Sequence, residues 1–170
     1  MKIINLFFLC VLLFISGCQT ANQVQIPPIP TSGTATLNFI GYPTEEAEGF
    51  IFASASVNKN NFPDISGADI ANVGSFLWAP GSPEGTGVID MGIVSLESIT
   101  EALDPNSNIY SGAGLGSEET KAVNHVACVR TRDGKYAKCK VISYSQNVSE
   151  NTTTFVIQWQ YQPSGSRTLY

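Results

Sequence analysis

Residues 128–139 read Cys-Val-Arg-Thr-Arg-Asp-Gly-Lys-Tyr-Ala-Lys-Cys, and they carry the clearest structural signal in the chain. Asp133-Gly134 stands between two runs of β-forming residues, which is a strong hairpin signal because both positions of a two-residue turn need positive φ. Such a turn places Cys128 directly opposite Cys139. Facing positions on antiparallel strands lie about 4.5–5.5 Å apart at Cα, within the range that a disulfide accepts. We therefore predict a Cys128–Cys139 disulfide, which a loop one residue longer would prevent.

Short runs of β-forming residues, broken by Gly, Pro and Asn, continue on both sides of this hairpin. The candidate strands are residues 34–40, 49–57, 75–79, 88–94, 123–131, 135–144 and 152–162. This pattern favours an all-β fold, either an antiparallel β-sandwich or a partly closed barrel. One short helical turn is expected after Ser98, because Glu101 completes a capping box and Pro105 stops a longer helix.

The last candidate strand alternates cleanly between two kinds of side chain. Aromatic and apolar residues occupy one face, and mostly glutamines occupy the other: Phe155, Ile157, Trp159 and Tyr161 against Val156, Gln158, Gln160 and Gln162. One face should pack on a core while the other is largely wet. The aromatic stripe could form a ligand platform, but ordinary core packing is the better interpretation.

The N-terminus has the order of an export signal. Lys2 supplies a positive charge, residues 6–15 form an apolar run, and small residues follow. This run is about half the roughly 20 apolar residues that a membrane-spanning helix needs. Residues 15–18, Ile-Ser-Gly-Cys, resemble a lipobox, which implies lipid transfer to the Cys18 thiol and cleavage before it. Gln19 rather than Asp follows the cysteine, and among Gram-negative lipoproteins this implies the outer membrane.

The predicted organisation therefore has three parts. Residues 1–17 are a lipoprotein signal peptide, residues 18–33 a lipidated N-terminus and flexible tether rich in proline, and residues 34–170 a single β-rich domain. The 43% hydrophobic content is enough for a packed core.

Charge limits the possible partners. The chain has 14 acidic and 9 basic residues, so its overall charge gives no attraction to nucleic acid. Residues 41–120 contain Lys59 as their only base, whereas six bases gather between Lys121 and Lys140: Lys121, Arg130, Arg132, Lys135, Lys138 and Lys140. These bases could dock an anionic partner, but a solvated hairpin whose lysines guard its edge is the favoured interpretation.

No catalytic constellation stands out in the sequence. His125 is the only histidine, and no Gly-x-Ser-x-Gly elbow accompanies it. A zinc site of His125, Cys128 and Cys139 is incomplete, and strand alternation puts His125 on the face opposite Cys128. Residues 104–108 copy the opening of a calcium loop, but Ile109 replaces its glycine and Leu115 its closing glutamate. We therefore predict no metal site and no catalytic residues.

The C-terminal third resembles a known family. Residues 129–138, followed by residues 155–167 with the run Tyr161-Gln162-Pro163-Ser164-Gly165-Ser166-Arg167, are similar to the C-terminal hairpin of HmuY-type lipoproteins. These are lipid-anchored all-β proteins whose type member carries haem for bacterial iron uptake. The family's best-known haem site uses paired axial histidines, with methionine in some relatives. Here His125 and Met91 are the candidates, and neither aligns with a ligand position of the family.

Together these patterns predict a lipid-anchored, non-enzymatic binding module of the bacterial envelope. It would be attached to the membrane through Cys18 and would bind an unknown small-molecule, glycan or protein ligand without a cofactor. Two alternatives remain open. One is a haem-uptake lipoprotein that uses His125, and the other is a carbohydrate-active enzyme with two acids converging in a deep cleft.

Overall fold

The computed structural model describes residues 31–79, 86–106, 110, 114–115 and 122–170. The predicted signal peptide, the Cys18 lipidation site and most of the predicted tether lie outside these residues, as does Lys121. Among the described residues, no helix is long and apolar enough to cross a membrane.

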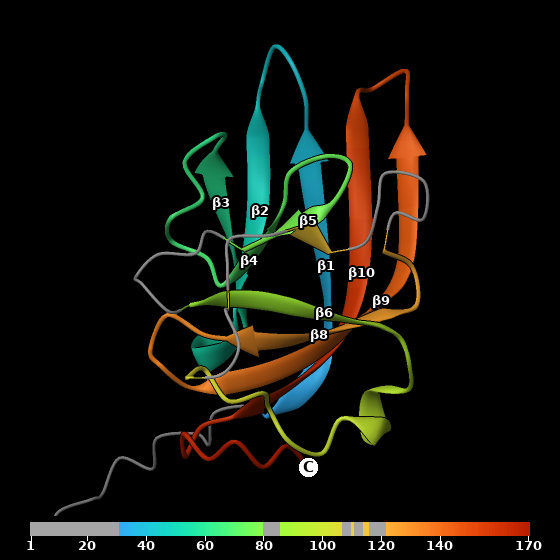
Figure 1. Cartoon of the computed structure of the whole chain (residues 1–170). Helices are drawn as coiled ribbons and strands as arrows, with labels where there is room; N and C mark the ends of the chain where they lie inside the picture. The colour runs from blue at the N-terminus through green and yellow to red at the C-terminus, as the bar shows by residue number, and fades with distance from the viewer. Residues whose placement is uncertain (1–30, 80–85, 107–109, 111–113, 116–121) are drawn as a thin grey trace, which may run out of the picture.

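The described chain is built almost wholly from antiparallel strands, as predicted (Figure 1). Its strands are β1 (Ser32–Ile40), β2 (Glu46–Ile51), β3 (Ser56–Asn61), β4 (Ile70–Asn72), β5 (Leu77–Trp78), β6 (Gly87–Ile93), β7 (Gly114–Leu115), β8 (His125–Arg130), β9 (Tyr136–Asn147) and β10 (Thr152–Gln162). Two single 3₁₀ turns accompany them, η1 (Phe52–Ser54) and η2 (Leu96–Ser98).

All the strands join one curved sheet in the order β6-β8-β9-β10-β1-β2-β4-β5-β7, and β3 pairs with the outer side of β2. β6 and β7, at the two ends of this order, contact each other. The sheet therefore closes into a nearly complete barrel, which confirms the predicted all-β class and selects the partly closed barrel over the sandwich.

The inside of the barrel is the main core. Every strand except β3 contributes a buried residue to it, and its largest side chains are Phe50, Phe52, Phe155, Trp159 and Tyr161. The Phe50 ring packs 5.2 Å from the Trp159 ring, centroid to centroid. The predicted inward face of the last strand is confirmed, because Phe155, Ile157, Trp159 and Tyr161 are all buried in this core. The opposite face is half-buried rather than largely wet, and Gln162 is buried.

A second apolar layer, which we call the outer cluster, covers the outside of β8 and β9. It contains Ala102, Tyr110, Cys128, Tyr136 and Leu169, brought together from β8, β9, the residues after η2 and the C-terminal residues. The backbone N–H of Ala102 donates to Arg167, and that of Leu169 donates to Thr100. These bonds hold the C-terminal residues against the η2 region.

The hairpin between β8 and β9 exists, but its predicted register is wrong by one residue. Ala127 faces Cys139, and Cys128 faces Lys138. The loop has three residues instead of two, because Thr131 N–H donates to Lys135 O at 3.0 Å and Gly134 N–H to Thr131 O at 2.9 Å. Gly134 alone has the positive φ, at 76°, which matches a three-residue hairpin with a glycine bulge.

This shift also makes the predicted disulfide wrong. Both cysteines are buried and free. Because side chains alternate along a strand, the shifted register sends Cys139 into the main core and Cys128 into the outer cluster. The two thiols therefore lie on opposite faces of the sheet.

Two smaller predictions also fail. The helical turn is η2, three residues earlier than predicted, and it is capped by Ser95, whose Oγ accepts from Ser98 N–H at 3.1 Å. The predicted strand 49–57 is interrupted by η1 and by Ala55 at φ 50°, so the chain turns back there and β3 pairs with β2. No Gly, Pro or Asn marks this turn in the sequence.

Candidate functional site

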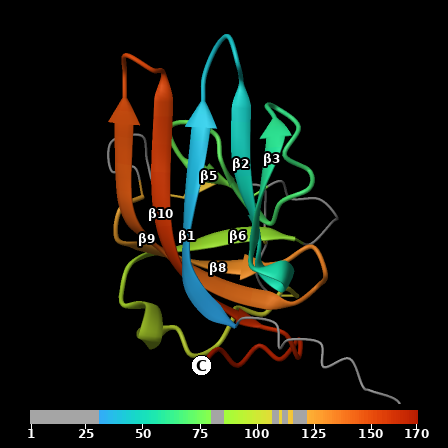
Figure 2. The same ribbon diagram turned by 180° about the vertical axis from the view of Figure 1, so that it is seen from behind.

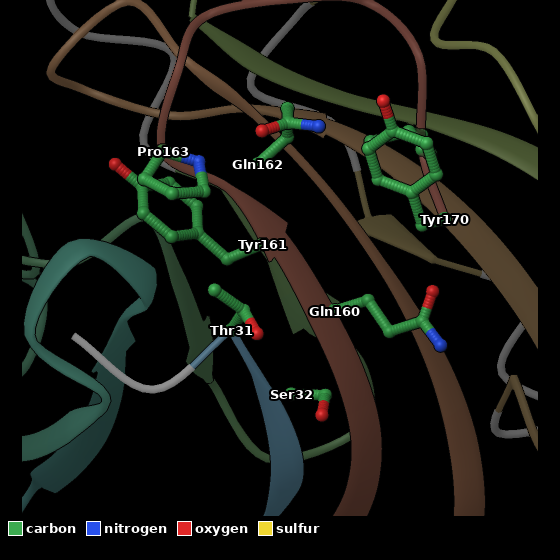
Figure 3. A pocket seen from close by; sticks show the side chains of 8 residues that line it. Thr31, Ser32, Gln160, Tyr161, Gln162, Pro163 and Tyr170 are labelled. Atoms are coloured by element: carbon green, nitrogen blue, oxygen red, sulfur yellow. The ribbon is translucent and has the colours of Figure 1, made fainter. Parts of the chain in front are cut away.

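A groove runs along the outer surface where β1 and β10 pair. It consists of two depressions of about 260 and 330 Å³ that share Ser32 and Gln160. The first is lined by Thr31, Ser32, Gln160, Tyr161, Gln162, Pro163, Leu169 and Tyr170, and the second by Ser32, Gly33, Thr34, Gln158, Trp159 and Gln160. We call the whole feature the Ser32–Gln160 groove; Figure 3 shows its first depression.

Strand alternation explains the polar lining of this groove. β1 faces β10 with the pairs Ser32–Gln160, Gly33–Trp159 and Thr34–Gln158. Since Trp159 points into the core, its neighbours Gln158 and Gln160 point outward, and they meet the hydroxyl groups of β1. The groove thus presents carboxamide and hydroxyl groups from two adjacent strands.

The C-terminal residues form the other wall of the first depression. Gln162 fixes this wall, because its Nε2 donates to Thr168 O at 2.8 Å and its Oε1 accepts from Ser164 Oγ at 3.0 Å. Tyr170 remains 87% exposed. In Figure 3 its ring lies across the depression from Thr31 and Ser32.

Two buried polar atoms on β10 have no hydrogen-bond partner among the described residues, Oε1 of Gln160 and Nε1 of Trp159. The Trp159 indole points into the core, and Gly33 lies over its edge, since a Cβ added there would be 3.3 Å from Cζ2 and 3.5 Å from Nε1. Buried polar atoms normally find a partner, so Oε1 of the outward-pointing Gln160 marks the place where a polar ligand or an ordered water can bind.

Among the described residues that line the two depressions, no side chain carries a carboxylate, ammonium, guanidinium, imidazole or thiol. Burial, followed by the hydrogen bond to the Asp133 carboxylate, raises the pKa of Tyr161, so its phenol stays neutral at physiological pH. The side chains of the groove are therefore uncharged, and they offer hydrogen-bond donors and acceptors beside the exposed ring of Tyr170. Sequence reasoning missed it, although the outward glutamines of the last strand were a signal of a polar face.

His125 and Met91, the predicted haem candidates, lie in different surroundings. Nδ1 of His125 is 2.9 Å from Oδ2 of Asp90. Met91 packs instead against the outer cluster, on the side of Cys128. Since His125 is three positions from Cys128 on the same strand, the two side chains point to opposite faces, and the structure does not bring His125 and Met91 together as an axial pair.

Two carboxylates meet near the tip of the β8–β9 hairpin. Asp69 accepts backbone N–H groups from Phe52 at 2.9 Å and Arg132 at 2.8 Å. Asp133 accepts the hydroxyl groups of Thr131 at 2.5 Å and Tyr161 at 2.7 Å. Burial raises the pKa of Asp69, while its two N–H donors oppose that rise. These bonds tie the hairpin to η1 and β10, so both carboxylates have structural roles.

The interpretation of the basic hairpin as wholly solvated is wrong at Lys138. This side chain is 1% exposed, and its Nζ donates to Ile99 O at 2.7 Å. Burial lowers the pKa of Lys138, against the opposing effect of Glu97. Lys138 therefore holds the η2 region onto β9 rather than guarding a free edge.

The candidate calcium loop forms an ordinary turn where it is described. Asp104 Oδ1 accepts from Asn106 N–H at 2.9 Å, and Asp104 Oδ2 is 3.4 Å from Arg167 Nη1. Residues 107–109 of this candidate loop lie outside the described residues. Among those that the structure describes, no group of three or more His, Cys, Asp or Glu side chains could hold a metal ion.

No protein-family model matches the chain, and no curated protein matches it. Three crystal structures resemble its fold. A Bacteroides fragilis protein assigned as a lipoprotein has 13% identity and a TM-score of 0.45 over 76% of this chain and 92% of its own. A Bacteroides vulgatus protein assigned as HmuY-like and haem-binding has 17% identity and a TM-score of 0.45 over 75% and 91%. The apo HmuY analogue of Tannerella forsythia has 10% identity and a TM-score of 0.42 over 80% and 99%. At TM-scores below 0.5, none of these likenesses assigns a function to the chain.

Proposed function

We propose that this protein is a lipid-anchored binding module of the bacterial envelope, without catalytic activity, and that it binds an uncharged, hydroxyl-rich ligand in the Ser32–Gln160 groove. Lipid on Cys18 would hold the protein at a membrane, with the outer membrane as its site. The barrel would then present the groove to the surrounding medium. A neutral glycan is the ligand class that best fits the groove.

The observation that carries this proposal is the chemistry of the groove lining. Hydroxyl and carboxamide groups both donate and accept hydrogen bonds, as sugar hydroxyl groups do, and aromatic rings pack against the apolar faces of sugar rings. The unpartnered Oε1 of Gln160 supplies an acceptor, and Tyr170 supplies an exposed ring. Glycosidic bond cleavage needs a pair of carboxyl groups, and no side chain of the described residues lining either depression supplies one. This supports binding over catalysis.

Calorimetric titration of the full-length protein in detergent tests the proposal directly. The probes are neutral trisaccharides, maltotriose and cellotriose, with the charged sugar glucuronate as comparator. We expect binding of a neutral trisaccharide and none of glucuronate. Chromatography of the trisaccharide after prolonged incubation should recover it uncleaved.

A matched pair of variants locates the site. Gln160→Leu removes the groove's free acceptor and should weaken binding about tenfold, which corresponds to about 1.4 kcal/mol. Gln146→Leu makes the same change at the exposed far end of β9 and should leave binding unchanged. Absence of binding by both trisaccharides, or equal affinity of the two variants, would overturn the proposal.

Haem binding through His125 is the second candidate, and one contact favours it. The Asp90 carboxylate holds Nδ1, so Nε2 is the ring nitrogen that could bind iron, an arrangement common among metal-binding histidines. A second axial ligand is not placed beside His125 by the described residues. We therefore expect no specific Soret band when haem is added. A tight, stoichiometric band that His125→Ala removes would favour this candidate over the glycan.

A further inference from the structure

Among the described residues, one edge of β1 has no hydrogen-bonded strand partner over most of its length. β1 pairs with β10 from Ser32 to Ile40, but it pairs with β2 only at Phe39 and Ile40. Figure 2 shows β1 continuing to the base of the molecule beyond the end of β2. Among the described residues, the stretch from Ser32 to Asn38 therefore has β10 as its only strand partner.

The register tells which backbone groups face this open edge. Tyr161 N–H donates to Thr31 O at 2.7 Å, so the pairs that exchange bonds with β10 are those of the odd-numbered residues of β1. The N–H and C=O groups of the even-numbered residues must then point away from β10. Asn38 confirms this, because its N–H donates to Oε2 of Glu48 at 2.8 Å. Ser32, Thr34 and Thr36 remain with both groups directed at the open edge.

This edge lacks the charged residues and prolines that usually prevent another strand from pairing with an edge strand. Ser32, Gly33, Thr34 and Thr36 are exposed, and none of them is charged or a proline. At one end of this stretch the N–H of Asn38 is taken by Glu48. The residues whose two backbone groups remain open, Ser32, Thr34 and Thr36, are centred on Thr34.

We propose that this edge pairs with the same edge of a second copy of the chain, antiparallel and about a twofold axis at Thr34. Thr34 then faces Thr34 of the second copy, and Ser32 faces Thr36 of the second copy. Because the twofold axis repeats the Ser32–Thr36 pair, there are three facing pairs. Each pair can exchange two backbone hydrogen bonds, which gives about six bonds in total.

A second copy fits this edge better than a charged partner strand. The facing side chains of the two copies are small and uncharged, so no like charges meet. Glu48 of one copy also lies at the opposite end of the interface from Glu48 of the other. Symmetric pairing of identical surfaces is also the commonest mode of protein association. Three facing pairs make a small interface, so the dimer should be weak in dilute solution and favoured where many copies share one membrane.

Register-specific cross-linking tests this dimer in the full-length protein in native membranes. Thr34→Cys places two thiols opposite each other at about 5.5 Å between Cα atoms, within disulfide range. A mild oxidant should convert most of it to a covalent dimer on a non-reducing gel. Thr36→Cys should give only the wild-type background, because its cysteine faces Ser32 of the second copy. The double change Ser32→Cys with Thr36→Cys should restore cross-linking.

Sedimentation of the detergent-solubilised protein at high concentration gives the independent test. Wild type should contain dimer, and Thr34→Lys should be monomeric, because two ammonium groups would meet at the axis. Thr36→Lys is the matched control and should keep most of the dimer. Equal cross-linking at positions 34 and 36, no cross-linking at position 34, or a monomeric wild type would overturn the proposal.

Discussion

The two buried thiols offer the sharpest test of the hairpin register. Cys139 lies in the main core, where burial raises the pKa of its thiol to about 12. Cys128 lies in the outer cluster, where burial also raises the pKa of its thiol, against the opposing effect of the nearby backbone N–H of Leu103. Replacing each cysteine with serine should therefore have unequal effects on stability.

Cys139→Ser places a hydroxyl group in an apolar environment, and leaving such a group unpaired costs about 1–3 kcal/mol. Cys128→Ser places its hydroxyl group near the backbone N–H of Leu103, with which it can pair, so its cost should be about 1 kcal/mol less. For a domain of this size each kcal/mol corresponds to roughly 2–4 °C in Tm. Thermal unfolding followed by circular dichroism should thus give a lower Tm for Cys139→Ser than for Cys128→Ser.

Alkylation and mass spectrometry complete this experiment. The native protein, never exposed to reductant, should react slowly with iodoacetamide at both cysteines, and the unfolded protein should react fully at both. A disulfide would instead make the two serine variants equally unstable, by about 3 kcal/mol each, and would block alkylation even after unfolding. That result would refute the three-residue loop and restore the register with Cys128 opposite Cys139.

Three further predictions concern other parts of the molecule. Asp133 is held by Thr131 and Tyr161; burial alone would raise the pKa of its carboxyl, but these hydrogen bonds lower it below the usual value. The ionised Asp133 carboxylate therefore contributes its full stabilisation above about pH 4, and this is lost as the pH falls through its folded-state pKa. In Asp133→Asn the free energy of unfolding, measured by urea denaturation, should fall less steeply as the pH is lowered. Phe155→Ala should reduce the free energy of unfolding by about 3–5 kcal/mol, measured by urea denaturation, because Phe155 is fully buried in the main core. Cys18→Ser should abolish acylation and move the protein from the detergent to the aqueous phase on partitioning, and an acylated variant would contradict the lipobox interpretation.

The sequence was most informative where side chains alternate without interruption. The strand at residues 152–162 has its predicted bounds and faces, because strict alternation of aromatic residues and glutamines leaves one way to bury the aromatic rings. The hairpin turn was misjudged because Asp-Gly fits both a two-residue loop and the end of a three-residue loop. In the longer loop Asp133 contacts Tyr161, a residue 28 positions away. A local sequence pattern does not predict a contact between residues so far apart in the chain.

The candidate site was harder to predict than the fold. The groove depends on a strand pairing between residues more than a hundred positions apart, Ser32 with Gln160, and on the placement of the C-terminal residues. Lys138 shows the same limit, because its burial depends on Ile99 and the η2 region rather than on its own neighbours. Single histidine and cysteine residues drew attention in the sequence, whereas the groove is made of common neutral residues.

An NMR titration of the isotope-labelled protein with maltotriose and cellotriose tests the central claim, that the Ser32–Gln160 groove binds a neutral polar ligand. If the groove binds the trisaccharide, the side-chain amide signals of Gln158 and Gln160 should shift saturably. The backbone signals of Ser32, Gly33 and Tyr170 should do the same. Signals of His125 and the β8–β9 hairpin should stay in place. Saturable shifts centred on His125, or no shifts with either trisaccharide, would contradict the account.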